Sequence, residues 1–552
     1  MPQISILERT DFFEKNTTVL EALQALQPAL VPTTLGCFCG GLSLELTHPL
    51  TQNCTLYPIT YQNEEGRRIY ERSLRVVLLL AVRRILPNAR VRIEHSVGYG
   101  IYAELLDHDT TEEEVESIET EMRRIVQENL PFKKERWTRQ QAIEYYKQDG
   151  ETDKTRLLAY RPYDYFNVYL CGGMAEYFYG SMLPSTGYIK AFALKHLAPG
   201  FGVLTPSPKD PDHPAPYMER PKHLQAFAQS TEWCRILHCT NAADLNDLVS
   251  QNKLRDFIRV NEALHDRSLA EIASGLQKRG ARAIFIAGPS STGKTTFANR
   301  LCIHLRVLGL SPVLISLDDF YRNKKDLPLE ENGEPDLEAL SALDVPHFRR
   351  CISALLNGQE VQMPRYDFTL GERSPVAVKM CLTESQPLVI EGIHGLNPEL
   401  HQGFPKELLS TIYISELTCL NLDNHNRIRT TDARLLRRIV RDYQFRNTSP
   451  DETMNMWNSV RHGEEKWIFP YQEQADFVFN SALHYELPVL KNIAYPLLNE
   501  ITPDNPNYLM SRRLLKILHY LLPAPEDALR EIPPLSILRE FIGGCTLYED
   551  NK

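Results

Sequence analysis

Hydrophobic positions in the second half of the chain form short apolar runs separated by stretches with helical spacing. Four runs predict buried strands, at 283–287, 313–317, 387–390 and 411–414. Parallel strands joined by crossover helices produce this alternation. The pattern therefore predicts an α/β fold with a parallel sheet in this half.

The first half follows a different pattern. Its first sixty residues are rich in β-formers and turn residues, and residues 67–85 form a long helical pattern. Residues 91–105 alternate like a strand pair that turns at Gly98 to Gly100, and helical patterns cover 110–129 and 138–148. The proline-dense stretch 206–221 is typical of a surface loop, so we expect the first major border near residue 230.

These shifts predict five segments. The first is a small β-containing domain at 1–62, and the second is an α+β domain at 63–230. A helical connector at 231–278 leads to the parallel-sheet domain at 279–500, and a helical tail to which we assign no chemistry follows at 501–552. A length of 552 residues suits about three to five domains.

Composition excludes several classes of protein. With 43% hydrophobic and 24% charged residues the chain is globular rather than disordered, and its longest apolar run, 76–82, is too short to cross a bilayer. Residues 1–13 lack the basic start of a secretory signal, so we expect a cytoplasmic protein without membrane partners. The net charge of -10 makes nucleic acid an unfavoured partner. The eleven scattered cysteines indicate reduced thiols.

The motif with the clearest chemistry follows the first apolar run of the second half. Residues 288–295 fit G-x-x-x-x-G-K-[ST] between a predicted strand and a predicted helix, the arrangement that cradles a nucleotide's phosphates. We expect Lys294 to reach the outer phosphates and Thr295 to ligate Mg²⁺. The predicted ATP-binding residues here are Gly288, Ser290, Ser291, Thr292, Gly293, Lys294, Thr295 and Thr296.

Carboxylates follow two more predicted strands. Asp318 and Asp319 come after 313–317, and Glu391 ends the run 387–390. Carboxyl ends of parallel strands line one crevice, so one of these carboxylates could deprotonate an attacking hydroxyl while the other organises Mg²⁺. A helix cap or loop pair is the alternative interpretation of Asp318 and Asp319.

Four arginines share one face of a predicted helix, at i, i+3, i+4 and i+7: Arg434, Arg437, Arg438 and Arg441. Like charges at this spacing repel unless an anion neutralises them, and arginine forks onto phosphate oxygens. We therefore predict a lid over a triphosphate, with a solvated basic face as the alternative. Tyr366 and Phe368 flank an aspartate, a pattern that fits either a site for a flat ring or ordinary core.

Together these motifs resemble the uridine kinase and phosphoribulokinase family over about 279–500. The resemblance implies transfer of a phosphoryl group from ATP, with Mg²⁺, to a nucleoside 5'-hydroxyl. It implies Asp318 as base, Glu391 as the magnesium-associated acid, and a lid of Arg434, Arg438 and Arg441, of which the latter two join Asp318 and Lys294 in catalysis. The implied nucleoside pocket comprises Tyr321, Tyr366, Phe368 and Arg373. Gly371 stands where uridine kinases carry a base-contacting histidine, so the preferred base stays open.

The first half resembles the ubiquitin-like and second additional domains of threonyl-tRNA synthetases, through 67–85, 95–105, the helix after Thr110, and the segments 170–173 and 186–192. That family's metal-binding positions correspond here to Arg72, Val76, Cys171 and Ala175, and one thiolate cannot build a zinc site. The whole chain then resembles bacterial nucleoside kinases fused to this N-terminal pair.

Three functions stay open from the sequence. The first is a nucleoside kinase, with a kinase of another small alcohol, such as a sugar phosphate or a pantothenate-like compound, as its rival. The second is a nucleotide-dependent switch whose synthetase-like half grips RNA. The third gives that half a scaffold role, in homo-oligomer formation or in regulation by a small metabolite.

Overall fold

The N-terminal segment folds as a small β-grasp unit in the computed structural model, which describes residues 1–329, 333, 335–367 and 370–547. Its mixed sheet has the order β2-β1-β5-β3-β4. The strands are β1 (Gln3–Ile6), β2 (Arg9–Phe12), β3 (Gly36–Cys39), β4 (Leu42–Leu44) and β5 (Cys54–Ile59). Helix α1 (Val19–Leu26) buries Val19, Ala22 and Leu23 in this unit's core and starts with a capping box between Thr18 and Glu21. The β-structure that the sequence predicts for this segment is present.

The second segment is built on the long helix α2 (Glu64–Ile85), as the sequence predicts. Two antiparallel sheets, β11-β12-β7-β6 and β10-β9-β8, complete it. Its remaining elements are β6 (Val91–Val97), β7 (Gly100–Leu105), α3 (Glu112–Glu128), β8 (Lys133–Thr138), α4 (Arg139–Gln148), α5 (Thr152–Ala159), β9 (Tyr165–Cys171), β10 (Met174–Glu176), β11 (Ala193–Leu197) and β12 (Gly200–Leu204). The predicted helices at 67–85, 110–129 and 138–148 and the turn at Gly98 to Gly100 are confirmed.

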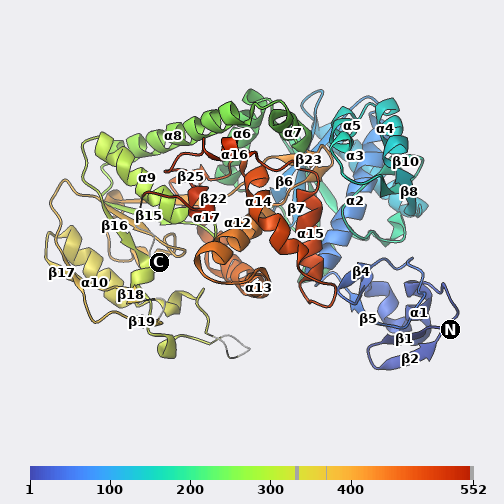
Figure 1. Ribbon diagram of the computed structural model, residues 1–552, viewed down its shortest axis with the longest axis horizontal. Helices are drawn as coiled ribbons and strands as arrows, with labels where there is room; N and C mark the ends of the chain where they lie inside the picture. The colour runs from blue at the N-terminus through green and yellow to red at the C-terminus, as the bar shows by residue number, and fades with distance from the viewer. Residues whose placement is uncertain (330–332, 334, 368–369, 548–552) are drawn as a thin grey trace.

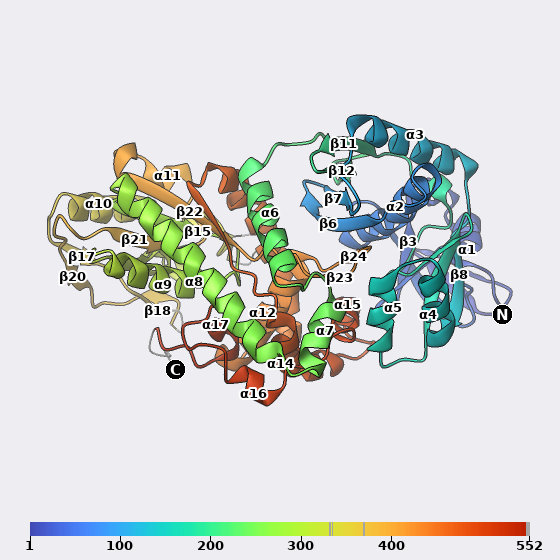
Figure 2. The same ribbon diagram turned by 90° about the horizontal axis from the view of Figure 1, so that it is seen from above.

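The stretch 206–221 is not simply a loop. It contains a two-stranded hairpin of β13 (Pro206–Ser207) and β14 (Asp210–Pro214). Prolines suit a pair with no further strand on either side, because an edge strand needs fewer backbone donors. Helices α6 (Pro221–Ile236), α7 (Ala242–Ser250) and α8 (Leu254–Arg279) follow. The predicted border at residue 230 falls inside α6, and α8 lies beside α9 (Figure 2).

The C-terminal half contains a five-stranded parallel sheet with the order β16-β21-β15-β22-β25. Its strands are β15 (Ala283–Ala287), β16 (Val313–Ser316), β21 (Leu388–Glu391), β22 (Leu409–Ser415) and β25 (Phe477–Asn480). The α/β fold with a parallel sheet is therefore confirmed, and the short edge strand β25 is the one the hydrophobic pattern missed.

Helices surround this sheet (Figure 1). They are α9 (Lys294–Val307), α10 (Val345–Leu356), α11 (Pro398–His401), α12 (Thr430–Phe445), α13 (Pro450–Trp467) and α14 (Glu486–Asn499). Small hairpins pair β17 (Val361–Met363) with β20 (Val378–Met380) and β18 (Tyr366–Asp367) with β19 (Glu372–Arg373). Within the described ranges, no helix has the length and apolar character needed to cross a membrane.

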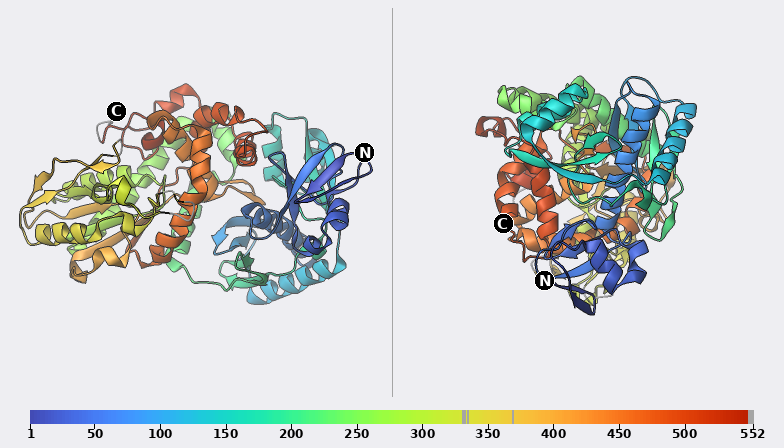
Figure 3. Two further views of the ribbon diagram at one scale, coloured as in Figure 1. Left: turned by 90° about the horizontal axis from the view of Figure 1, so that it is seen from below. Right: turned by 90° about the vertical axis from the view of Figure 1, so that its right-hand side faces the viewer.

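The C-terminal tail belongs to the core of this half. It forms α15 (Tyr508–Leu518), α16 (Glu526–Leu529) and α17 (Arg539–Ile542). One hydrophobic cluster runs from Tyr146 in α4 through Phe297 in α9 and Leu436 in α12 to Phe541 in α17. Figures 1 and 3 show the orange and red segments between the yellow-green sheet and the blue N-terminal half. The tail is thus packed across both halves.

A hairpin from the C-terminal half enters the N-terminal half. Strands β23 (Asn421–Asp423) and β24 (Asn426–Arg427) lie just before α12, and the Ile93 amide of β6 donates a hydrogen bond to the Asn424 carbonyl at 2.7 Å. The Tyr177 hydroxyl donates to Asp423 at 2.8 Å, and buried Lys154 pairs with Glu176 at 2.6 Å beside His425. The hairpin therefore joins the two halves next to α12.

Candidate active site

The phosphate-binding loop lies between β15 and α9. A Cβ at Gly288 would stand 2.0 Å from the Ile414 carbonyl oxygen of β22, so the first position of the motif must be glycine. Gly293 has φ +82° and precedes the first turn of α9, which starts at Lys294. This geometry turns backbone amides and a helix N-terminus toward one point, where phosphate oxygens are stabilised. The local structure predicted for residues 288–296 is confirmed.

Lys294 lies over this loop and donates a hydrogen bond to the Pro289 carbonyl at 3.1 Å. Burial lowers the pKa of Lys294, while the carboxylates of Glu391, Glu540 and Asp318 oppose that shift. A buried ammonium beside three carboxylates is positioned to exchange its carbonyl contact for a phosphate oxygen.

One hydroxyl links the Glu391 carboxylate to the backbone of Asp318. Ser316 at the end of β16 pairs in register with Glu391 of β21, donates a hydrogen bond to Glu391 Oε1 at 3.0 Å and accepts one from the Asp318 amide at 3.3 Å. Burial raises the pKa of Asp318. The charge of Lys294 opposes this rise, and the charge of Asp319 adds to it. Burial and Asp318 raise the pKa of Glu391 to about 7. The strand ends thus bring both acids to the loop, as the parallel sheet predicts.

The arginine face differs from its prediction in part. Arg434 and Arg437 are almost fully buried and pair with Glu464 of α13 and Glu486 of α14. Arg434 also donates to the Ser290 carbonyl at 3.0 Å, so it braces the loop instead of facing an open cleft. Neither a free lid nor a solvated face describes these two arginines, because helices remote in sequence supply their counter-charges.

The other two arginines lie closer to the edge of the site. Arg438 donates to the Ser290 hydroxyl at 3.0 Å and lies 3.2 Å from Asp442, and Arg441 pairs with Asp442 at 2.7 Å. Burial and the neighbouring Arg441 lower the pKa of Arg438. These two guanidinium groups share one aspartate, which leaves positive charge at the loop.

The residues predicted to hold the acceptor lie beyond Asp318. The rings of Tyr321 and Tyr366 are 5.8 Å apart, and the Tyr366 amide donates to Asp319 at 3.3 Å. Arg373 binds the Tyr321 carbonyl at 2.9 Å and Asp344 at 3.3 Å. Arg373 is thus a brace for the Tyr321 segment. Phe368 lies outside the described residues.

Two glutamates at the site escape sequence reasoning. Burial and the nearby Glu464 raise the pKa of Glu338 to about 7, and a Cβ on Gly463 of α13 would stand 2.4 Å from the Glu338 Cβ. Glu540 of α17 accepts hydrogen bonds from the Thr296 amide at 3.3 Å and the Thr296 hydroxyl at 2.8 Å. No motif marks either glutamate, because both reach the loop only through tertiary packing.

The oxygen donors of the site suit a hard cation. Thr295 is exposed in the first turn of α9, and Glu391 and Asp318 are carboxylates at adjacent strand ends. Mg²⁺ prefers a few such oxygens together with substrate phosphates, so the residues fit this ion. In the N-terminal half, the described residues contain no group of three or more potential ligands from His, Cys, Asp and Glu that could hold a metal. There Arg72 instead pairs with Glu65 at 2.9 Å.

Comparison with known proteins assigns the C-terminal half to a class. A model of the phosphoribulokinase / uridine kinase family matches residues 283–487. A uridine kinase of Halobacterium salinarum is 32% identical over 198 residues, which cover 36% of this chain and 78% of that protein. The chain belongs to the phosphoribulokinase and uridine kinase family, and its C-terminal half is a P-loop kinase domain.

The N-terminal region matches threonyl-tRNA synthetases. A threonine–tRNA ligase of Desulforamulus reducens is 32% identical over 184 residues, which cover 33% of this chain and 29% of that protein. The chain therefore spans less than a third of the length of that relative. Among solved structures, one described as a possible uridine kinase from Bacillus stearothermophilus matches 41% of this chain and 100% of its own, at 21% identity and a TM-score of 0.26. The predicted fused architecture is confirmed.

The contact between Glu540 and Thr296 predicts competition with ATP. A carboxylate on the donors that face phosphate must be displaced before the nucleotide binds. We expect Glu540→Gln to lower the KM for ATP by about 3- to 10-fold, since one removed charge repulsion amounts to roughly 1 kcal/mol. Steady-state kinetics against ATP measure this, with Glu526→Gln in exposed α16 as control. An unchanged or higher KM would contradict the prediction.

The raised pKa of Glu338 predicts a pH dependence of stability. A carboxyl whose pKa rises from 4.5 to about 7 on folding stabilises the protein below 4.5, and this contribution is lost as the pH rises through 7. Between pH 5 and pH 8, Glu338→Gln should therefore gain about 1–3 kcal/mol in unfolding free energy relative to the parent. Urea denaturation at both pH values tests it, with exposed Glu384→Gln as control. A difference that does not change with pH would refute this assignment.

Proposed function

We propose that the protein phosphorylates the 5'-hydroxyl of a nucleoside, using ATP as donor. The observation that carries the proposal is the position of Asp318. It follows β16, its backbone amide donates to Ser316, which in turn donates to Glu391, and the Lys294 ammonium lies near both acids. A phosphate-binding loop and a buried carboxylate on the same edge of the sheet are the parts that transfer to an alcohol requires.

The proposed step needs one proton acceptor and several positive charges. Asp318 takes the proton of the acceptor hydroxyl. At the same time the hydroxyl oxygen forms a bond to the γ-phosphorus, and the bond between that phosphorus and the β-γ bridging oxygen breaks to release ADP. A pKa raised by burial brings Asp318 nearer the range useful for a general base. Lys294, Arg438 and Arg441 stabilise charge on the transferring group.

Two oxygen donors of this chain would hold magnesium. We assign these roles to the Thr295 hydroxyl and to Glu391, and the bound ion would neutralise charge on the β- and γ-phosphates. The loop residues Gly288, Ser290, Ser291, Thr292, Gly293 and Thr296 would bind ATP mainly through backbone amides. Arg434 would contribute indirectly, because it holds the Ser290 carbonyl.

Two arginines near the predicted acceptor residues are committed to protein partners, which favours an uncharged acceptor. Arg365 pairs with Asp319 at 2.9 Å, and Arg373 is committed to Asp344 and to the carbonyls of Phe320 and Tyr321. A sugar phosphate would need at least one such guanidinium free. Tyr321 and Tyr366 offer ring surface for a base. Gly371 has φ +69° and offers no side chain at the histidine position of uridine kinases, so the base stays unspecified.

We infer a cytoplasmic enzyme in which the synthetase-like half acts as scaffold or regulator and does not grip RNA. The eleven cysteines of the whole chain are unpaired, and the net charge of the chain is -10. The hairpin 421–427 connects that half to α12 directly. Homo-oligomer formation stays a prediction.

Lys294→Ala and Asp318→Asn test the catalytic assignment. Each should lower kcat by about 10²- to 10⁴-fold, because one removes a phosphate contact and the other the proton acceptor. Neither supports the hydrophobic core, so circular dichroism and thermal unfolding should match the parent. Lys278→Ala and Asp451→Asn are matched controls on exposed or half-exposed helix positions. Folded variants with parental rates would overturn the assignment.

The acceptor is tested with ATP, Mg²⁺ and a panel of nucleosides, sugar phosphates and pantothenate. We expect ADP release and a 5'-monophosphate only with nucleosides, detected by coupled assay and mass spectrometry. Turnover of a sugar phosphate without turnover of any nucleoside would contradict the proposed nucleoside acceptor but would still support kinase activity.

A further inference from the structure

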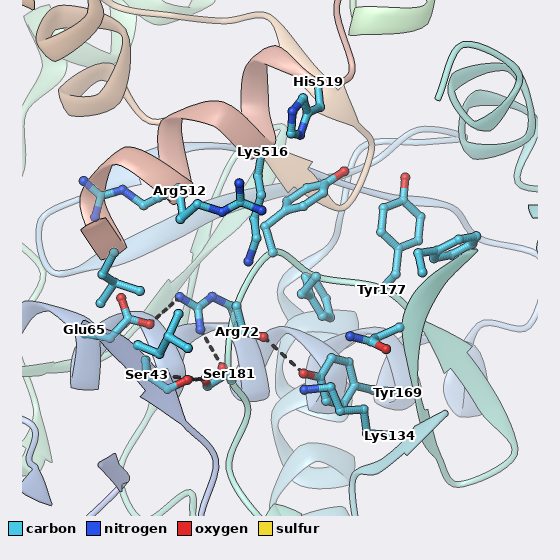
Figure 4. A pocket seen from close by; sticks show the side chains of 18 of the residues that line it. Ser43, Glu65, Arg72, Lys134, Tyr169, Tyr177, Ser181, Arg512, Lys516 and His519 are labelled. Carbon is cyan, nitrogen blue, oxygen red and sulfur yellow. Dashed lines mark hydrogen bonds and ion pairs between the residues drawn. The ribbon is translucent and has the colours of Figure 1, made fainter. Parts of the chain in front are cut away.

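A basic cavity is lined by residues outside the phosphate-binding loop. Its volume is about 430 Å³, and it opens where β4, the second segment and α15 meet (Figure 4). The lining includes one carboxylate, Glu65, against six lysines and arginines: Arg72, Lys134, Arg161, Arg512, Arg513 and Lys516. Such an excess of cations in a volume typical of small-molecule sites favours an anionic ligand.

Some of these cations already have partners. Arg72 pairs with Glu65 at 2.9 Å, Arg513 with Asp432 at 3.1 Å, and Lys134 with Glu45 at 3.1 Å. Arg512 and Lys516, one turn apart on α15, have no carboxylate partner in the described part of the chain. Figure 4 shows Lys516 extending from α15 into the cavity. Two uncompensated charges on one wall are therefore available to an anion.

The cavity is electrostatically unfavourable when empty of anions. Burial, Arg72 and Arg512 lower the pKa of Lys516 to about 8, and burial together with Arg512 lowers the pKa of His519 to about 4. Bound negative charge would reverse the repulsive part of these shifts. Binding near pH 8 should consequently be accompanied by proton uptake at Lys516.

Aromatic rings form the other walls. Arg161 lies over Phe166 at 4.7 Å and over Tyr520 at 5.4 Å. Tyr163 is 45% exposed, and Tyr508 and Tyr179 are half-buried at the cavity. Tyrosine faces beside arginine are suited to stacking with a planar ring.

We propose that this cavity binds a small phosphorylated ligand carrying a planar ring, the chemistry of a nucleotide, at a site separate from the P-loop. Arg512 and Lys516 take the phosphate oxygens, and the tyrosines Tyr163, Tyr179 and Tyr508 take the ring. Of the four positions that correspond to the synthetase metal ligands, only Arg72 lines this cavity. The site therefore combines the second segment with α15 of this chain, and its volume suits a small molecule.

The cavity also has a physical connection to the kinase. Arg513 lines it and holds Asp432 in the first turn of α12, two residues before Arg434, which binds the Ser290 carbonyl. A phosphate that competes with Asp432 for Arg513 changes the charge balance at the start of α12. Ligand in the cavity and ATP in the loop should thus alter each other's affinity by the same factor.

Calorimetric titration of the full-length Lys294→Ala protein, in which the loop's own phosphate affinity is weakened, tests the site. The probes are AMP, ADP, UTP, pyrophosphate and adenosine. We expect a nucleotide to bind, and the added pair Arg512→Ser and Lys516→Gln to weaken it about 100-fold through two lost charge-assisted contacts. The matched pair Arg530→Ser and Lys278→Gln, on exposed positions outside the cavity, should leave affinity unchanged.

The outcomes are distinct. Equal nucleotide affinity in the cavity pair and the control pair overturns the site. If pyrophosphate binds as tightly as nucleotides, the proposed contact between the ring and the tyrosines is wrong. If a tRNA acceptor-stem fragment binds and nucleotides do not, the proposal that the ligand is a small molecule is wrong. In buffers of different ionisation enthalpy at pH 8, the parent cavity should show proton uptake that Lys516→Gln abolishes, a signature that a merely structural effect would not give.

The kinase connection needs a second measurement with the otherwise unmodified chain. The tightest probe should shift the KM for ATP in the parent, and the cavity pair should abolish this shift while keeping the parental rate without probe. A probe that binds in the cavity without changing the KM refutes the connection to α12. Because basal phosphoryl transfer is measured in the same assay, failure of the cavity is distinguished from failure of the proposed kinase.

Discussion

A buried ion pair between Arg434 and Glu464 sets the position of the phosphate-binding loop. The Glu464 carboxylate also accepts a hydrogen bond from the Ser290 amide at 3.1 Å, while Arg434 donates one to the Ser290 carbonyl at 3.0 Å. Both polar groups of one loop residue are therefore fixed by α12 and α13. Removing either partner of such a pair would leave an uncompensated buried charge, at a cost of about 3–5 kcal/mol. The carboxylates, Lys294 and Arg438 are all positioned relative to this brace.

The same helix connects the loop to the rest of the molecule. At its start, Arg429 pairs with Glu71 of α2 at 2.7 Å, and Asp432 lies 3.6 Å from Arg68 and 3.1 Å from Arg513. One end of α12 thus contacts the synthetase-like half and the tail, and the next turn contacts the nucleotide loop. This helix is the physical link along which the proposed coupling between the cavity and the loop would run.

The sequence predicts what depends on local pattern and misses what depends on distant partners. The loop 288–295 and the acids Asp318 and Glu391 could be placed, because strand ends of a parallel sheet share one edge. Helical spacing put Arg434 and Arg437 on one face, but it could not show that Glu464 and Glu486 cover that face. Glu338 and Glu540 carried no signal, since each is brought to the loop by folding alone. The cavity beside α15 was invisible for the same reason.

The hairpin 421–427 makes the two halves inseparable. Asp423 and His425 are buried and Arg427 is partly buried against the synthetase-like half. There the Tyr177 hydroxyl donates to Asp423, Lys154 contacts His425, and Glu71 lies near Arg427. A gene fragment encoding only the catalytic half would expose these polar groups beside bare apolar surface. Exchange of one half for an unrelated domain would leave the same polar groups without their partners.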